Sequence, residues 1–527
     1  MVAAEVCPSG RPKPVICQYG TLTMLSPVED AKPREHLDRP LSVGAGQRQF
    51  KPAIVSGGVW IVTAKIVSQL SQVAMFFVAA RLLSPAEFGL FAFFSAIAML
   101  LVVVAEGGWA EFMMKAGDED DCFDQVTTIS LFSGCLFTAV GVVATAVFYG
   151  FTGDEKQSAL LALFSCWMLP AALTAAFDGT LVVSGRLRQR AIVRIAGETS
   201  GLIAAMVLLH LHAHASALAA AKVICQLVLL IGSVRATRRL PRLRVTKPVL
   251  AEVMAFSRQI VGNRLVAFLG SYSGTLVVGS FLGIADAGFY RAAERIVAVV
   301  SELLGEPARS LSWVVFRRAH LQPGAPARSV GHAGIRFLLV LLAIAAPMYL
   351  GLAQVSDAVV RLTLGEVWIP AASIIPFLCL RQLLLSPGYI NEASLSVVGH
   401  IRYRLPVTLL NVVVSLVAII AAARFGLWEL AIVQCFTAAF ALATCIGLQS
   451  KFVGVNWLEI ARGVVLLIMP ASIMMVAAVG LVRQYFSEDL SWRPVLVLQI
   501  GAGVLAYAAG LMVAVGLGTR LRWLTLK

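Results

Sequence analysis

Long apolar segments recur along the chain from about residue 57 onward, separated by short polar stretches. Each is close to the roughly 20 residues that an α-helix needs to cross a bilayer. They do not alternate polar and apolar positions, as the strands of a membrane β-barrel would. We therefore predict an all-α integral membrane protein with about fourteen transmembrane helices. Their approximate bounds are 57–80, 88–106, 126–149, 158–183, 195–211, 215–233, 256–283, 287–315, 334–353, 370–396, 405–423, 427–449, 462–482 and 494–516.

Composition agrees with this pattern. Of the 527 residues, 59% are hydrophobic and only 14% are charged, which excludes an ordinary water-soluble domain. The formal charge of +14 comes from short basic clusters beside the apolar segments, which is typical of contact with anionic lipid headgroups rather than nucleic acid. The nine cysteines occur singly, mostly inside apolar segments, so we expect neither a disulfide framework nor a metal centre.

The loops are short. None is longer than about 20 residues, which leaves no room for a nucleotide-binding or glycosyltransferase domain. The chain also lacks a phosphate-binding glycine loop of the GxxxxGK[ST] type. We expect no cofactor and no enzymatic activity.

A short motif occurs twice. Residues 83–91 (LSPAEFGLF) follow the first apolar segment and residues 282–290 (LGIADAGFY) follow the seventh, at an offset of 199. A second echo joins residues 185–190 (GRLRQR) to 399–404 (GHIRYR) at an offset of 214, with Asp178 and Glu392 in register. Each half then holds six helices, and because six is even both halves cross the bilayer in the same direction. We predict two pseudo-symmetric six-helix lobes around a central cavity, with two further C-terminal helices.

Basic residues set the orientation. On the map above, 29 of the 43 lysines and arginines lie on the side of the N-terminal tail, so both termini are predicted to be cytoplasmic. The predicted organisation is a disordered cytoplasmic tail (1–52), an N-lobe (53–233), a basic cytoplasmic linker (234–253), a C-lobe (254–449), and two additional helices with a basic tail (450–527).

Several of these motifs resemble the polysaccharide transport, or Wzx-type, flippase family of the multidrug/oligosaccharidyl-lipid/polysaccharide exporter superfamily. The resemblance is carried by residues 80–91, the Glu106-Gly-Gly turn, residues 288–293 and the arginines after the fourth and tenth segments, and it extends from residue 55 to about 520. It implies two six-helix lobes around a cationic cavity that alternately faces cytoplasm and periplasm.

The cargo implied by the resemblance is an undecaprenyl-pyrophosphate-linked oligosaccharide, translocated across the bacterial inner membrane for lipopolysaccharide or exopolysaccharide export. Lipid-linked oligosaccharide, membrane lipids, a polysaccharide polymerase and a chain-length regulator are the expected partners.

Charged residues inside apolar segments are costly and mark candidate sites. In the first segment Lys65, Ser68, Gln69 and Gln72 form one polar helical stripe, and the offset of 199 aligns Lys65 with Arg264. Two interpretations stay open: both cations line the cavity and bind a pyrophosphate, or each is paired with a neighbouring acid or carbonyl group.

The eighth segment carries five charges on one helical face, at Arg291, Arg295, Glu302, Glu306 and Arg309. They are expected to line the cavity or to form a salt-bridge network between the lobes, and Glu302 or Glu306 could carry a proton. Arg381 interrupts the tenth segment, where Pro376 is expected to unwind the helix. The candidate substrate-binding residues are Lys65, Gln69, Gln72, Arg264, Arg291, Arg295 and Arg381, and the candidate coupling or gating residues are Glu302 and Glu306.

Two other function classes compete with a flippase. A cation-coupled multidrug antiporter of the same superfamily would favour an acidic cavity, whereas the candidate residues here are mostly basic. A membrane polymerase, ligase or acyltransferase would be expected to carry a large outer loop or a histidine in the middle of a span, and the predicted spans show neither.

Overall fold

The computed structural model describes residues 50–117, 120–211, 214–321, 326–486 and 491–520. It forms two units, residues 1–53 and 54–527, and the description below concerns the second. The predicted N-terminal tail lies outside the described residues except at 50–52, where the first helix has already begun, and the end of the basic C-terminal tail (521–527) also lies outside them.

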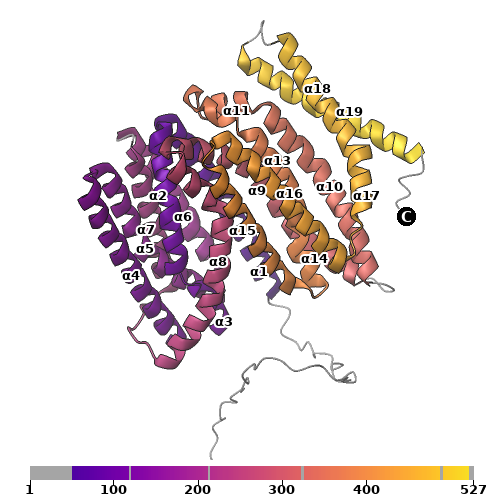
Figure 1. Ribbon diagram of the computed structural model, residues 1–527. Coiled ribbons are helices and arrows are strands. Elements are labelled where there is room, and N and C mark those ends of the chain that lie inside the picture. Colours follow the sequence, from indigo (N-terminus) through magenta and orange to yellow (C-terminus); the bar gives the residue numbers. More distant parts are fainter. Residues whose placement is uncertain (1–49, 118–119, 212–213, 322–325, 487–490, 521–527) are drawn as a thin grey trace, which may run out of the picture. The chain divides into compact units, whose positions relative to one another are not determined.

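Every regular element in the described ranges is a helix (Figure 1). The first half contains α1 (Phe50–Leu82), α2 (Pro85–Ala105), α3 (Trp109–Ala116), α4 (Asp120–Thr152), α5 (Glu155–Val183), α6 (Leu187–Leu211) and α7 (Ala215–Thr237). The second half contains α8 (Lys247–Phe281), α9 (Ile284–His320), α10 (Pro326–Gln354), α11 (Ser356–Thr363), η1 (Glu366–Trp368), α12 (Ile369–Ala372), α13 (Ile375–Leu385), η2 (Ser386–Ile390), α14 (Asn391–Val397), η3 (Ile401–Tyr403), α15 (Arg404–Ala422) and α16 (Leu427–Leu448). The chain continues through η4 (Gln449–Val453), α17 (Trp457–Gly463), η5 (Val464–Ile468), α18 (Met469–Phe486) and α19 (Trp492–Arg520).

Eleven of the described helical stretches are long and apolar enough to cross a membrane. A twelfth crossing is a bent pair, Glu366–Ala372 with Ile375–Val397, whose halves meet at 46°. Helices α8 and α9 have 35 and 37 residues but are too polar to be among these. The described residues therefore confirm an all-α multi-pass membrane fold with eleven or twelve apolar crossings, whereas the fourteen predicted from the sequence also include α8 and α9.

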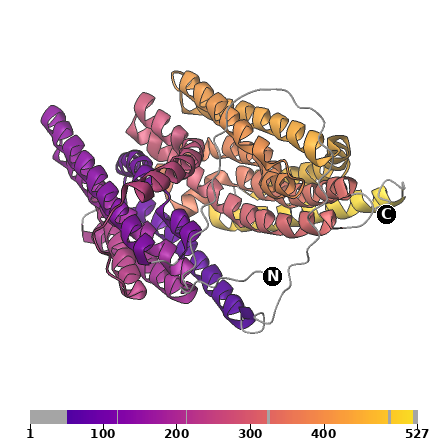
Figure 2. The same ribbon diagram turned by 90° about the horizontal axis from the view of Figure 1, so that it is seen from below.

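The helices pack as two bundles. In the first, α5 lies against α4, α3 and α7, and α6 lies against α7. In the second, α13 lies against α10 and α16, α9 against α10, and α15 against α16 (Figures 1 and 2). Helices α18 and α19 pack on each other and reach the second bundle through α10 and α11.

The lobes meet where α2 and α9 begin. The starts of these helices, Pro85 and Ile284, keep the offset of 199 found in the sequence repeat. A Cβ atom on Gly89 would overlap the carbonyl oxygen of Ile284, and one on Gly288 would overlap that of Pro85. The contact is therefore reciprocal, as expected for two related lobes, and only glycine permits such close backbone approach.

The second repeat also has a structural counterpart. Gly185 and Gly399 both adopt left-handed backbone conformations, with φ of 69° and 77°. After Gly185 the backbone N–H of Arg186 donates to the carbonyl of Leu181 at 2.9 Å, and after Gly399 the equivalent N–H of His400 donates to that of Leu395 at 2.8 Å. Glycine at these positions ends a helix without steric strain.

An ion pair recurs beside each of these turns. Arg190 of α6 binds Asp178 of α5 through two contacts of 2.7 Å. At the offset of 214, Arg404 binds Glu392 at 3.0 Å. The residues that were in register in the sequence are thus partners within each lobe.

The linker between the lobes is shorter than predicted. The prediction placed it at 234–253, whereas α7 continues to Thr237 and α8 starts at Lys247. Pro248 lies in the first turn of α8, where its missing N–H costs no helical hydrogen bond. The proline therefore begins the helix rather than extending the loop.

Trp368 packs between the two lobes near the starts of α2 and α9. Its side chain is 1% exposed and its indole N–H donates to the carbonyl of Ala80 at 2.7 Å. Phe88 and Phe289 meet its ring edge-to-face at 5.4 and 6.0 Å. Arg81 adds hydrogen bonds to the last carbonyls of α11, where a cation complements the helix dipole.

Substitution of Gly288 tests the close contact between α9 and α2. Gly288→Ala should lower the free energy of unfolding by about 1–3 kcal/mol because the new methyl group overlaps the backbone of α2. Gly351→Ala on α10 is the matched control, since its added Cβ meets nothing within 4 Å. Thermal unfolding in detergent checks both variants, and equal melting temperatures would contradict the close packing described here.

Candidate functional site

A polar cavity of about 290 Å³ lies between α1 and α6. We call it the N-lobe cavity. The stripe predicted on the first helix lines one side, and two arginines of α6 line the other. Its charged and polar lining residues are Lys65, Ser68, Gln69, Gln72, Arg190 and Arg194.

Each cation of the N-lobe cavity has an acidic partner that does not itself line the cavity. Lys65 Nζ lies 2.6 Å from a carboxylate oxygen of Glu306 on α9, which joins the two lobes. Both side chains of this pair are about half exposed, at 53% and 47%. Arg190 binds Asp178, and Arg194 lies 3.9 Å from Glu198. Three positive groups therefore border the cavity, with their counter-charges outside its lining.

Arg264 makes a second bridge between the lobes. Its guanidinium on α8 contacts Glu106 at 3.1 Å and Glu111 at 2.6 Å. All three side chains are about one-third exposed. Arg264 does not line the N-lobe cavity. Lys65 and Arg264 are thus equivalent in the repeat, and both are ion-paired with acids of the opposite lobe.

A second cavity of about 350 Å³ lies in the C-lobe between α8, α9 and α13. We call it the arginine cavity. Its charged lining residues are Arg291, Glu294, Arg295, Glu302 and Arg381. Four of these come from one face of α9, as the helical spacing predicts, and Arg381 comes from the helix that follows the bend.

Charges in the arginine cavity form two groups. Glu294 lies 2.7 Å from Arg291 and 3.8 Å from Arg381. Arg295 Nη1 donates to Glu302 at 3.1 Å. The lining therefore holds three arginines and two glutamates, which leaves one positive charge in excess.

Arg295 has an unused donor. Its Nη2 atom is buried and makes no hydrogen bond with the described residues. An unsatisfied buried donor costs about 1–3 kcal/mol. A bound oxygen atom would remove that cost.

The cavities contain residues that sequence reasoning missed. Arg190 and Arg194 were not among the predicted site residues, yet they lie in the first two turns of α6 and line the N-lobe cavity. Their spacing of four residues was the available signal. Glu294 was also missed, although it lies one turn after Arg291 on the charged face of α9. Glu111, a partner of Arg264, gave no signal beyond its charge.

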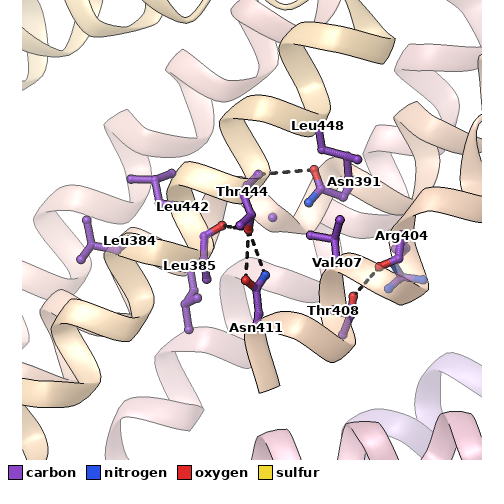
Figure 3. Close-up of a pocket in the computed structure, with 13 residues that line it drawn as sticks. Leu384, Leu385, Asn391, Arg404, Val407, Thr408, Asn411, Leu442, Thr444 and Leu448 are labelled. Carbon is purple, nitrogen blue, oxygen red and sulfur yellow. Dashed lines mark hydrogen bonds between the residues drawn. The ribbon is translucent and has the colours of Figure 1, made fainter. Parts of the chain in front are cut away.

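A third cavity of about 170 Å³ lies between η2, α14, α15 and α16 (Figure 3). Asn411 and Thr444 point toward each other across it and exchange hydrogen bonds of 3.0 and 3.1 Å. Arg404 is its one charged lining residue and is already paired with Glu392. These contacts hold α15 on α16, so we assign this cavity to helix packing. Within the described ranges no group of three His, Cys, Asp or Glu side chains could hold a metal ion.

A known sequence family matches much of the chain. Residues 78–373 match the model of a family described as "Polysaccharide biosynthesis protein". The chain belongs to this family. The match runs from the end of α1 through the rest of the N-lobe and into the C-lobe as far as the bend after α12.

Two curated relatives agree with the family. The chain is 23% identical over 310 residues to the succinoglycan biosynthesis transport protein ExoT of Rhizobium meliloti, a match that covers 58% of this chain and 62% of that protein. It is 25% identical over 136 residues to the teichuronic acid biosynthesis protein TuaB of Bacillus subtilis, covering 26% of this chain and 27% of the relative. The matches thus span less than two thirds of either relative.

Solved structures confirm the fold. The lipid II flippase MurJ in an inward closed conformation matches with a TM-score of 0.63 at 13% identity, covering 85% of this chain and 98% of that chain. An inward-facing multidrug resistance MATE family transporter of the MOP superfamily matches with a TM-score of 0.58 at 13% identity, covering 73% and 96%.

Family and fold together confirm the predicted resemblance. The protein is a multi-pass membrane protein of this family, and the ExoT relative is named a transport protein.

The Arg264 bridge makes the second prediction. Arg264→Ala should lower the free energy of unfolding by about 1–3 kcal/mol because Glu106 and Glu111 lose their partner. The triple variant Arg264→Met, Glu106→Gln, Glu111→Gln should be closer to wild type, since it leaves no unpaired charge. Thermal unfolding compares them, and an equal loss in both variants would show that the bridge acts through packing alone.

Proposed function

We propose that this protein flips an undecaprenyl-pyrophosphate-linked oligosaccharide across the bacterial inner membrane, with both termini in the cytoplasm, for export of a surface polysaccharide. One observation carries the proposal: the N-lobe cavity is lined by three cations, two glutamines and a serine, with no carboxylate in its lining. A polysaccharide polymerase and a chain-length regulator would act on the same cargo after translocation.

The N-lobe cavity suits a diphosphate headgroup. Arg194 offers a planar guanidinium group that can bind two phosphate oxygens at once, and Lys65 offers a mobile point charge. Arg190 binds Asp178 through Nε and Nη2 and keeps Nη1 for a phosphate oxygen. Gln69, Gln72 and Ser68 supply neutral hydrogen-bonding groups beside them. With the predicted orientation, the arginines begin α6 at its cytoplasmic end, where a headgroup from the inner leaflet would arrive.

Binding would release a contact between the lobes. In the structure, Lys65 is held by Glu306 of α9. Exposed ion pairs contribute only about 0–1 kcal/mol, so a diphosphate with several negative charges competes effectively for Lys65. We assign Glu306 the gating role: its separation from Lys65 frees α1 from α9 while cargo is bound.

The drug antiporter is the rival of the same superfamily. Its cationic cargo would meet three cations in the lining of the N-lobe cavity, whose acidic partners lie outside that lining. The likeness to the MATE transporter concerns the fold alone, at 13% identity. The charge of the lining therefore favours the flippase.

Complementation of a mutant lacking its polysaccharide flippase makes the third prediction. Wild type should restore surface polymer, and Lys65→Ala, Arg190→Ala and Arg194→Ala should each reduce it severalfold at matched membrane levels, because one charged contact to phosphate is worth about tenfold or more in affinity. Arg318→Ala, an exposed arginine on α9, is the control and should keep wild-type polymer.

The double variant Lys65→Glu, Glu306→Lys separates the effect on cargo binding from the effect on the ion pair between α1 and α9. It can re-form the contact between the lobes but places a negative charge in the N-lobe cavity, so polymer should stay low. Full restoration by this variant would show that the pair serves structure alone. Wild type that restores no polymer in several hosts but raises drug resistance would replace the proposal with the antiporter.

A further inference from the structure

We propose that the arginine cavity of the C-lobe binds a carboxylate-bearing sugar, a hexuronate, within the oligosaccharide of the cargo. The inference rests on the proposed function and adds a second binding site, separate from the N-lobe cavity that would hold the diphosphate. It names an acidic sugar as the class of residue that this protein recognises.

Charge balance identifies a single negative group. The lining holds three arginines and two glutamates, so one monovalent anion neutralises it. A diphosphate would bring more negative charge than the cavity can balance and would meet the carboxylates of Glu294 and Glu302. The N-lobe cavity, with three cations and no carboxylate in its lining, lacks this restriction. The two cavities therefore select different anions.

The donors are placed for a carboxylate. Arg295 Nη1 donates a hydrogen bond to Glu302, and the buried Nη2 of Arg295 has no acceptor among the described residues. Arg291 donates to Glu294 at 2.7 Å and its guanidinium lies 4.8 Å from the centre of the Tyr272 ring, which fixes its position by a cation–π interaction. Arg381 is held more loosely, at 3.8 Å from Glu294. Arg381 thus keeps hydrogen-bonding capacity for a ligand, and Arg295 Nη2 gains it once the side chain turns this buried atom toward the cavity.

Neutral groups in the same lining suit sugar hydroxyls. The amide N–H of Gln382 donates a hydrogen bond to the hydroxyl of Tyr389 at 2.9 Å. The amide oxygen of Gln382 remains as an acceptor. Ser271 donates to its own helix backbone and can accept as well. Both line the cavity. Its volume of about 350 Å³ lies in the range of roughly 300–1,000 Å³ usual for small-molecule sites.

A binding experiment on the purified full-length protein in detergent tests the inference. The probes are methyl β-D-glucuronide, methyl β-D-glucoside, which lacks only the carboxylate, sodium acetate and inorganic pyrophosphate. Calorimetry should show that the glucuronide binds at least about tenfold more tightly than the glucoside or acetate, as expected for a charge-assisted contact added to hydroxyl contacts.

Variants locate the site. Arg295→Gln should weaken glucuronide binding by about tenfold or more and leave pyrophosphate binding unchanged. Lys65→Gln should do the reverse. Gln382→Ala provides a second test that keeps all charges, and should weaken the glucuronide and the glucoside alike. A wild-type melting temperature verifies that each variant is folded.

Other outcomes overturn the inference. Equal binding of glucuronide and glucoside would indicate a neutral-sugar site, and equal binding of acetate would indicate a simple anion site. Glucuronide binding that Arg295→Gln and Gln382→Ala both leave intact would place the ligand elsewhere, and no glucuronide binding at all would refute the site. Each of these can occur while the protein still restores surface polymer, whereas failure of complementation with glucuronide binding intact would count against the flippase alone.

Discussion

An ionised side chain is costly in the hydrocarbon core of a membrane unless it is paired or wet, and the architecture of this protein follows from that constraint. Lys65 of α1 meets Glu306 of α9, and Arg264 of α8 meets Glu106 and Glu111. Arg295 meets Glu302 within α9. The first two of these bridges join the lobes. An anionic cargo that enters between the helices must compete with the same carboxylates, so binding and the contact between the lobes draw on one set of charges.

The two lobes share the backbone features of the repeat but differ in the charged residues that line their cavities. Both lobes share the glycine at the start of α2 or α9, the left-handed glycine turn and the ion pair beside it. The cavities do not share their chemistry: the charged residues that line the N-lobe cavity are all cations, whereas the arginine cavity includes two glutamates. Two related bundles can therefore hold chemically distinct parts of one cargo.

The sequence predicted the helices, the repeat and the charged faces well, because apolar length and helical spacing are local properties. The offset of 199 correctly paired Gly89 with Gly288, and the offset of 214 paired Arg190 with Arg404. Ion-pair partners were harder, since Glu306 is 241 residues from Lys65 and only tertiary packing brings them together. Arg194 was assigned to a loop because the positive-inside rule and a cavity lining produce the same basic cluster beside an apolar segment.

The central claim is that a diphosphate takes Lys65 from Glu306 and so frees α1 from α9. Spin labels at Val62 and Leu303, both exposed, in a variant whose nine cysteines are replaced, would measure the distance between these helices. We expect the distance between the two labels to increase when pyrophosphate binds, and to increase equally without pyrophosphate in Glu306→Gln. An unchanged distance distribution with pyrophosphate shown by calorimetry to be bound would contradict it.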